Sequence, residues 1–80
     1  MIEELDCVAL TRDVPEHGLV TGDIGGVFGV HQGGKGHTVE FMSPGGDTIA
    51  ILTLHADALR RLRKREIANA RALAPQPVTD

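Results

Sequence analysis

The 80 residues carry 41% hydrophobic and 24% charged side chains and a formal net charge of −3, which suits one small folded domain and argues against disorder, a multidomain enzyme or a repeat array. The one cysteine, Cys7, excludes an internal disulfide, and no Cys/His spacing is typical of zinc, so we expect no metal and no cofactor. Because a chain this short buries only about 60% of its unfolded surface, we expect a compact barrel, oligomerisation or both to stabilise it.

Charge is unevenly divided along the chain. Residues 1–57 hold two cations against nine acids, which leaves −7, whereas residues 58–80 hold six cations against two acids, which leaves +4. Nucleic-acid affinity depends mainly on neutralisation of phosphates by Lys and Arg, so only the second segment could supply it. Alternatively, this segment is a solvated helix face or a counter-charge for the acidic part. Its cations are Arg60, Arg61, Arg63, Lys64, Arg65 and Arg71.

The beginning of the chain is typical of a strand followed by a long loop. The apolar run at 5–10 predicts a strand with Val8 and Leu10 on the same side. The loop after it contains Pro15, which lacks a backbone donor, and Gly18, which tolerates a positive φ.

Glycines mark the middle of the chain. A strand at 24–30 contains three of them, which predicts a bulge or a sharp bend of the kind that small barrels use at their corners. The glycine-rich segment 32–36 predicts a hairpin loop, and the alternation over 37–42 places Val39 and Phe41 inward.

The next predicted strand, at 47–54, is apolar on both faces. Ile49 and Ile51 share one face, and the alternate positions, also apolar, share the other. A barrel interior can take one set, so the tail or another copy of the chain must cover the second. As interaction residues we choose Ala50, Leu52, Leu54, Leu59 and Leu62.

After Leu54 the pattern allows two structures. A helix from 55 to about 73 would place Leu59, Leu62 and two further apolar residues on one side, and periodicity alone favours it. The alternative is a 3₁₀ turn at 56–58 followed by a short closing strand at 59–62.

The order of these parts resembles a known family. The residues that carry the resemblance are LTRDVPEHGL at 10–19, GDIGGV at 22–27, VEF at 39–41, TIA at 48–50 and DALR at 57–60. This pattern is similar to the bacterial family catalogued as domain of unknown function 4926, whose members resemble SH3-like small barrels. The resemblance covers roughly residues 5–62 and implies an all-β, five-stranded SH3-like barrel with a 3₁₀ turn before its last strand, which reverses the preference for a helix.

The resemblance implies a domain boundary but no chemistry. We assign residues 1–63 to the SH3-like barrel domain and residues 64–80 to a basic tail, partly helical or disordered, that departs from the family pattern. The family has no assigned activity. Some of its members are encoded beside toxin-like proteins, which implies an antitoxin or immunity-type inhibitor as one possible role.

No arrangement of side chains predicts an enzyme. Cys7 lies on a core strand, so we expect a buried, inert thiol, and the carboxylates near the N-terminus are typical of solvated charges. His31 and His37 flank the hairpin loop, but two imidazoles are too few for a structural zinc, and ordinary polar edge residues are expected. The glycines at 22–29 are followed by no helix that could bind a phosphate.

The sequence therefore predicts a non-enzymatic protein-interaction module that self-associates, as a homodimer, and that could bind a protein partner. Nucleic-acid binding through the basic tail and inhibition of a neighbouring toxin are the alternatives. The N-terminus lacks the basic flank and apolar run of a signal peptide, and no apolar stretch is long enough to span a bilayer, so we expect a cytoplasmic protein without membrane contact.

Overall fold

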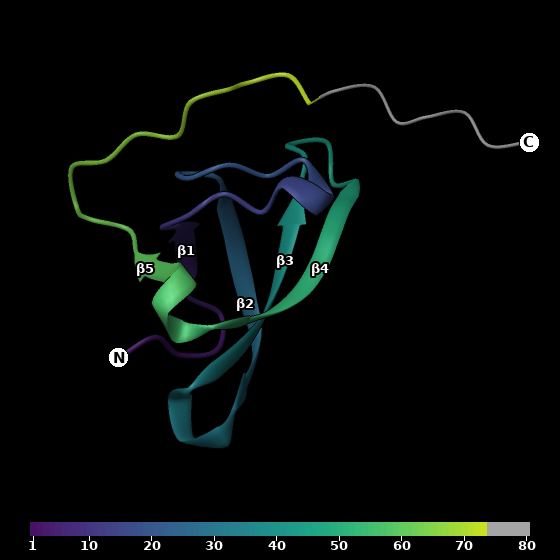
Figure 1. Ribbon diagram of the computed structural model, residues 1–80. Helices are drawn as coiled ribbons and strands as arrows, with labels where there is room; N and C mark the ends of the chain where they lie inside the picture. The colour runs from purple at the N-terminus through teal and green to yellow at the C-terminus, as the bar shows by residue number, and fades with distance from the viewer. Residues whose placement is uncertain (74–80) are drawn as a thin grey trace, which may run out of the picture.

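The computed structural model describes residues 1–73, which form a five-stranded antiparallel sheet with three 3₁₀ turns and no α-helix (Figure 1). The strands are β1 (Cys7–Leu10), β2 (Ile24–His31), β3 (Gly36–Met42), β4 (Thr48–His55) and β5 (Leu59–Arg61). Their order in the sheet is β4-β3-β2-β1-β5, so the first strand lies between the second and the last. The prediction of a small all-β fold is confirmed.

Alternate strand residues face a common apolar interior. Val8 and Leu10 of β1, and Val39 of β3, are each at most 1% exposed. The loop between β1 and β2, which contains the turn η1 (Pro15–His17), closes one end of this interior. The core cluster is Val8, Leu10, Val14, Leu19, Val27, Val39, Phe41 and Leu59.

The glycines of β2 have separate roles. The register between β2 and β3 shifts between Val27 and Gly29, which confirms the predicted irregularity. Gly25 is buried, and a Cβ atom there would lie 2.6 Å from Cγ1 of Val39 and 3.0 Å from the carbonyl oxygen of Glu40. β2 and β3 can therefore approach one another closely only because this position has no side chain.

The sheet is completed by the turn η3 (Ala56–Ala58) and by β5. The Ala56 N–H donates to the carbonyl of Lys35, the carbonyl of Ala58 accepts from the Thr11 N–H, and β5 pairs with β1. This is the second of the two structures that the sequence allowed, and the helix from 55 that periodicity alone favoured is wrong. Burial of Ala58 and Leu59 in the core, together with the free edge of β1, outweighs the helical spacing of the leucines.

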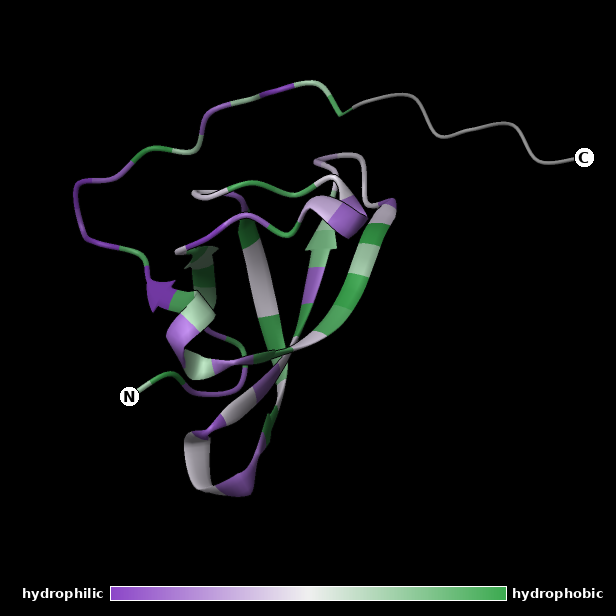
Figure 2. Ribbon diagram, viewed as in Figure 1, coloured by the Kyte–Doolittle hydropathy of each residue, from purple (hydrophilic) through white to green (hydrophobic). Residues whose placement is uncertain are grey.

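Residues 62–73, which we call the strap, follow β5 without forming a helix or a strand. The strap runs back past the loops at one end of the sheet (Figure 1), and hydrophilic and hydrophobic residues are interspersed along it (Figure 2). The partial helix considered for the tail is therefore not found between 64 and 73, and residues 74–80 lie outside the described part. Among residues 1–73, no helix has the length and apolarity that crossing a membrane requires.

Candidate interaction surface

An exposed apolar surface covers the side of β2, β3 and β4 that faces away from the core. We call it the outer face. Phe28 is 47% exposed, Met42 is 51% exposed and Ile51 is 54% exposed, although all three are large apolar residues. Exposed side chains of this size in one region are typical of a surface that another molecule covers. The outer face consists of Ile24, Phe28, Met42, Ile49 and Ile51.

Part of the outer face is hollowed. An open hollow of about 400 Å³ lies over β2, where Gly26 leaves open space in place of a side chain. Among the described residues, Glu40 is the one charged residue in its lining, and its Oε2 accepts a hydrogen bond of 2.6 Å from the Thr48 hydroxyl. The hollow is therefore a mainly apolar depression. It is lined by Leu5, Cys7, Ile24, Gly25, Gly26, Val27, Phe28, Glu40 and Met42.

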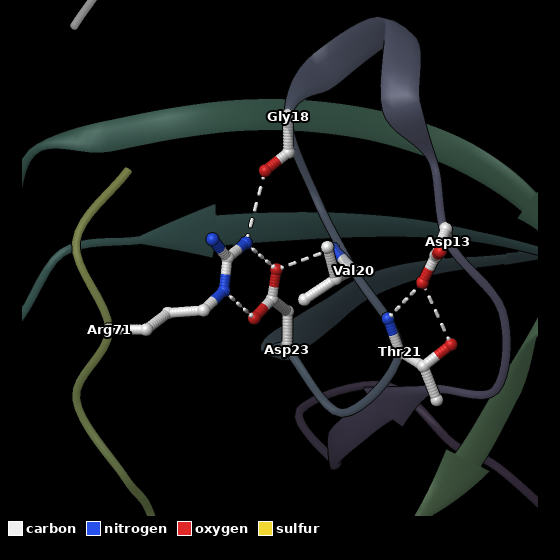
Figure 3. A network of polar contacts seen from close by, with 6 residues as sticks. All are labelled: Asp13, Gly18, Val20, Thr21, Asp23 and Arg71. Atoms are coloured by element: carbon white, nitrogen blue, oxygen red, sulfur yellow. Dashed lines mark hydrogen bonds and ion pairs between the residues drawn. The ribbon is translucent and has the colours of Figure 1, made fainter. Parts of the chain in front are cut away.

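The strap is fixed to the loop before β2 by one arginine. Nε of Arg71 donates to Oδ1 of Asp23 at 2.8 Å, and Nη2 donates to Oδ2 of the same carboxylate and to the carbonyl of Gly18 at 3.0 Å (Figure 3). We call this group of three residues the latch. A bidentate pair between arginine and a carboxylate fixes orientation as well as charge.

Hydrogen bonds within the loop between β1 and β2 hold the acceptor groups of the latch in place. Oδ2 of Asp23 also accepts from the Val20 N–H at 2.9 Å, and Asp13 accepts from the N–H and the hydroxyl of Thr21 at 2.8 and 3.0 Å (Figure 3). The hydrogen bond from Arg71 is the largest cause that lowers the pKa of Asp23, and the two bonds from Thr21 lower the pKa of Asp13. Both side chains are therefore held as carboxylates at neutral pH.

The latch borders a second apolar depression. A cleft of about 360 Å³ lies between the strap and the end of the sheet. From the sheet it is lined by three residues of the outer face, Ile24, Met42 and Ile49, and from the strap by Ile67 and Leu73 among others. The strap therefore borders the outer face.

Half of the tail cations already have acidic partners. The guanidinium of Arg60 bonds both carboxylate oxygens of Glu66 at 2.8 and 2.6 Å, and Nε of Arg61 lies 3.5 Å from Oδ2 of Asp6. Arg71 completes the paired set. Within residues 1–73, no ion pair includes the side chains of Arg63, Lys64 or Arg65. Arg61 and Arg71 thus pair with acids of residues 1–57, whereas Arg60 pairs with an acid of the tail itself.

We expect the strap to lose its anchors in acid. Bonds from the Arg60 side chain and the Arg63 N–H lower the pKa of Glu66 from 4.5 to about 2, and Arg71 lowers that of Asp23. A lowered folded-state pKa contributes stability that is complete above the unfolded pKa and is lost as pH falls toward the folded one, here between about pH 4.5 and 2. Carboxyl ¹³C titration by NMR should place the Glu66 midpoint near pH 2, and Arg60→Gln should raise it. A wild-type midpoint near 4.5 would contradict this anchor.

The structure places the interaction residues chosen from the sequence mainly inside. Ala50, Leu52 and Leu54 pack partly buried against the core, and Leu59 belongs to it. Leu62 is 36% exposed. On β4 the interior therefore takes the set that we chose, and the opposite set, Ile49 and Ile51, is left exposed. Phe28 and Met42, which the sequence analysis did not choose, lie on the same face.

Two expectations about side-chain burial are wrong. Cys7 is exposed, because it pairs across from Gly26 on the outer side of β1. His37 is only 1% exposed, and within the described part of the chain neither of its ring nitrogens has a hydrogen-bond partner. His31 does lie at the surface, where its Nε2 is 2.7 Å from the hydroxyl of Thr38. Among residues 1–73, no three His, Cys, Asp or Glu side chains are grouped as metal ligands would be.

Comparison with known proteins assigns the folded part but not a chemistry. Residues 4–61 match the model of a family described as Domain of unknown function (DUF4926). No curated protein and no solved structure matches the chain. The matched region includes all five strands and the Asp23 side of the latch, and it ends before the strap.

Proposed function

The chain belongs to the DUF4926 family, and we propose that it is a non-enzymatic interaction module with an SH3-like barrel fold that self-associates through its outer face. The barrel proposal is supported by the strand order β4-β3-β2-β1-β5 and by a 3₁₀ turn that leads into a short last strand paired with the first. The family match covers residues 4–61, which form the folded part, and assigns no activity to them.

The observation that carries the proposal is the outer face. Three of its five large apolar residues, Ile24, Phe28 and Met42, line the hollow over Gly26, and one carboxylate, already hydrogen-bonded, is the only charge that the described residues place there. An apolar area of this kind gains free energy when it leaves water, at roughly 25 cal/mol per Å². A second copy offers an identical apolar area, and a two-fold symmetric contact would cover both at once.

Ile51→Lys tests this proposal with little risk to the fold. Ile51 lies directly across from Glu40 in the register of β3 and β4, so a lysine there would gain an opposite charge as its neighbour. We expect the dimer dissociation constant to rise about tenfold or more, because a buried lysine must be desolvated, while the thermal unfolding of the monomer changes little. Analytical ultracentrifugation across a concentration series measures this effect.

Val30→Lys is the matched control. Val30 is 41% exposed and pairs with His37, which faces the core, so it lies outside the outer face and the same change in charge should leave association unchanged. Leu62→Lys places the same substitution at a residue chosen from the sequence, so its effect on the dimer dissociation constant can be compared with that of Ile51→Lys. A wild-type chain that stays monomeric at every concentration, or an Ile51→Lys chain that dimerises like the wild type, would count against the proposal.

Nucleic-acid binding through the tail is the second proposal. The observation in its favour is the run Arg63, Lys64 and Arg65, three consecutive cations that belong to no ion pair in the described part of the chain. Phosphate binding by this run would fall steeply with salt and would disappear when all three are replaced by glutamine. We place it second because Arg60, Arg61 and Arg71 are engaged with carboxylates.

A further inference from the structure

We propose that the latch is exchanged in the dimer: the strap of each copy leaves its own cleft, and its Arg71 binds Asp23 and the Gly18 carbonyl of the other copy. This inference rests on the self-association proposed above and names the residue that each copy contributes to the other. The site is thus an arginine-binding site for an extended segment, and the segment it accepts is the strap of a second copy.

The acceptor side of this site is built by the folded domain. The Asp23 side chain is 18% exposed, its Oδ2 is fixed by the Val20 N–H, and the Gly18 carbonyl supplies a second acceptor for the same guanidinium. All three residues lie in the region that matches the family, whereas Arg71 lies ten residues beyond the end of that match, at residue 61. The domain therefore carries a formed arginine site, and a separate segment fills it.

The strap is held in a way that permits exchange. Between Leu62 and Leu73 it forms no strand with the sheet, and Ile67 remains 92% exposed although it borders the cleft. Beyond the Glu66 anchor near β5, the hydrogen bonds that tie it to the body within residues 1–73 are those of Arg71. Release of this part of the strap therefore breaks the hydrogen bonds of one side chain and the apolar contacts of Leu73 in the cleft, and it unfolds no helix or strand.

The position of the cleft links exchange to the outer face. Ile24, Met42 and Ile49 belong to both surfaces, so a second copy seated on the outer face would lie beside the cleft. A strap normally favours its own cleft because its effective concentration there is in the millimolar range. Once two outer faces meet, the clefts of both copies lie in the same complex. The strap then has a high effective concentration at the other copy's cleft as well, and its preference for its own cleft disappears. Exchange of an identical segment then creates two equivalent contacts across one two-fold axis.

Charge also favours the exchanged contact. The body, residues 1–57, carries −7 and the tail carries +4, so the bodies of two copies repel each other and a tail is attracted to either body. A strap that reaches across places positive charge between the two acidic bodies. An unexchanged dimer leaves each tail on its own copy.

A pair of charge-reversed full-length chains tests the exchange. In Asp23→Arg positions 23 and 71 are both positive, and in Arg71→Glu they are both negative, so neither chain can close its own latch or that of an identical copy. Mixed together, each can bind the strap of the other. We expect each variant alone to dimerise at least about fivefold more weakly than the wild type, and the equimolar mixture to recover wild-type affinity as a heterodimer. Native mass spectrometry with one isotope-labelled chain gives the relative amounts of the two homodimers and the heterodimer.

The controls separate folding from exchange. The chain carrying both Asp23→Arg and Arg71→Glu restores the charge pair within one copy and shows whether the fold tolerates an arginine at position 23. Arg65→Glu, at a cation without an ion pair in the described residues, should not select heterodimers. Independently of any variant, isotope-filtered NOEs in a wild-type mixture of labelled and unlabelled chains should connect Leu73 of one copy with Met42 or Ile49 of the other.

The outcomes distinguish exchange from self-association. Dimers of wild-type affinity in both single variants, a mixture without preference for the heterodimer, or a wild-type dimer whose strap contacts are all within one copy would overturn exchange and leave the proposed function standing. A wild-type chain that does not associate at all would overturn both.

Discussion

Replacing Gly25 with alanine is expected to lower the free energy of unfolding by about 1–3 kcal/mol, the range of an overpacked core position. The added Cβ would lie 2.6 Å from Cγ1 of Val39, 3.0 Å from the carbonyl oxygen of Glu40 and 3.1 Å from Cδ1 of Phe41. Val39 can rotate, but the Glu40 carbonyl belongs to the backbone of the paired strand, so relief requires β2 and β3 to separate. Denaturant unfolding followed by circular dichroism measures the change.

Gly26→Ala is the matched control for Gly25→Ala. It is the next residue of the same strand, and nothing in the described part of the chain lies within 4 Å of the Cβ position there. Because alanine loses less backbone entropy than glycine on folding, we expect the unfolding free energy to rise by roughly 0.5 kcal/mol. The same substitution at two neighbouring residues should thus change the free energy of unfolding in opposite directions. Equal effects would show that the close approach of β3 is not what selects glycine at position 25.

Replacing His37 with leucine is expected to raise the free energy of unfolding by about 1–2 kcal/mol. The imidazole is 1% exposed and both of its ring nitrogens lack partners among residues 1–73, so the folded state loses the hydrogen bonds that water supplies when the chain is unfolded. Val30 and Leu54, the residues paired with it on β2 and β4, are apolar. Leucine has a similar volume and needs no partner, so it should pack there without this penalty.

His31→Leu provides the comparison for His37→Leu. His31 is exposed, and its Nε2 forms a 2.7 Å hydrogen bond with Thr38, whose hydroxyl is 3.0 Å from that of Thr53. Its replacement removes a satisfied surface bond, and we expect a loss of stability of about 0.5–1 kcal/mol. Should His37→Leu instead destabilise the protein, a partner for the ring, such as a buried water molecule, would have to be present.

The strands were predictable because their signals are local. Alternation placed Val8, Leu10, Val39 and Phe41 on the inner side, where the core contains them, and the glycines of β2 indicated the bulge. The expectation of a buried thiol extended the burial of β1 to its first residue, whereas β1 is buried from Val8 to Leu10 and Cys7, opposite Gly26, is exposed.

The outer face and the latch depend on pairing between distant residues. β4 is apolar on both sides, so its alternation could not decide which set is interior. The register does, because Ala50 pairs with Phe41 and Leu52 pairs with Val39, both of which face the core. Asp23 and Arg71 meet across 48 residues, and the sequence showed only that their segments carry opposite net charge. Which arginine would bind which acid is a property of the folded chain.

The place of β1 in the sheet also affects synthesis of the protein. Of the five strands it is synthesised first, yet one of its two neighbours, β5, is the last of the five, and the register pairs Val8 with Arg61. The meander β2-β3-β4 can assemble from local hairpins while one edge of β1 still exposes unpaired backbone groups. Until η3 brings β5 to that edge, a nascent chain presents a strand that chaperones or other unfinished copies can bind. Once residues 56–61 have folded, β5 pairs with this edge of β1, and the backbone groups there can no longer bind other chains.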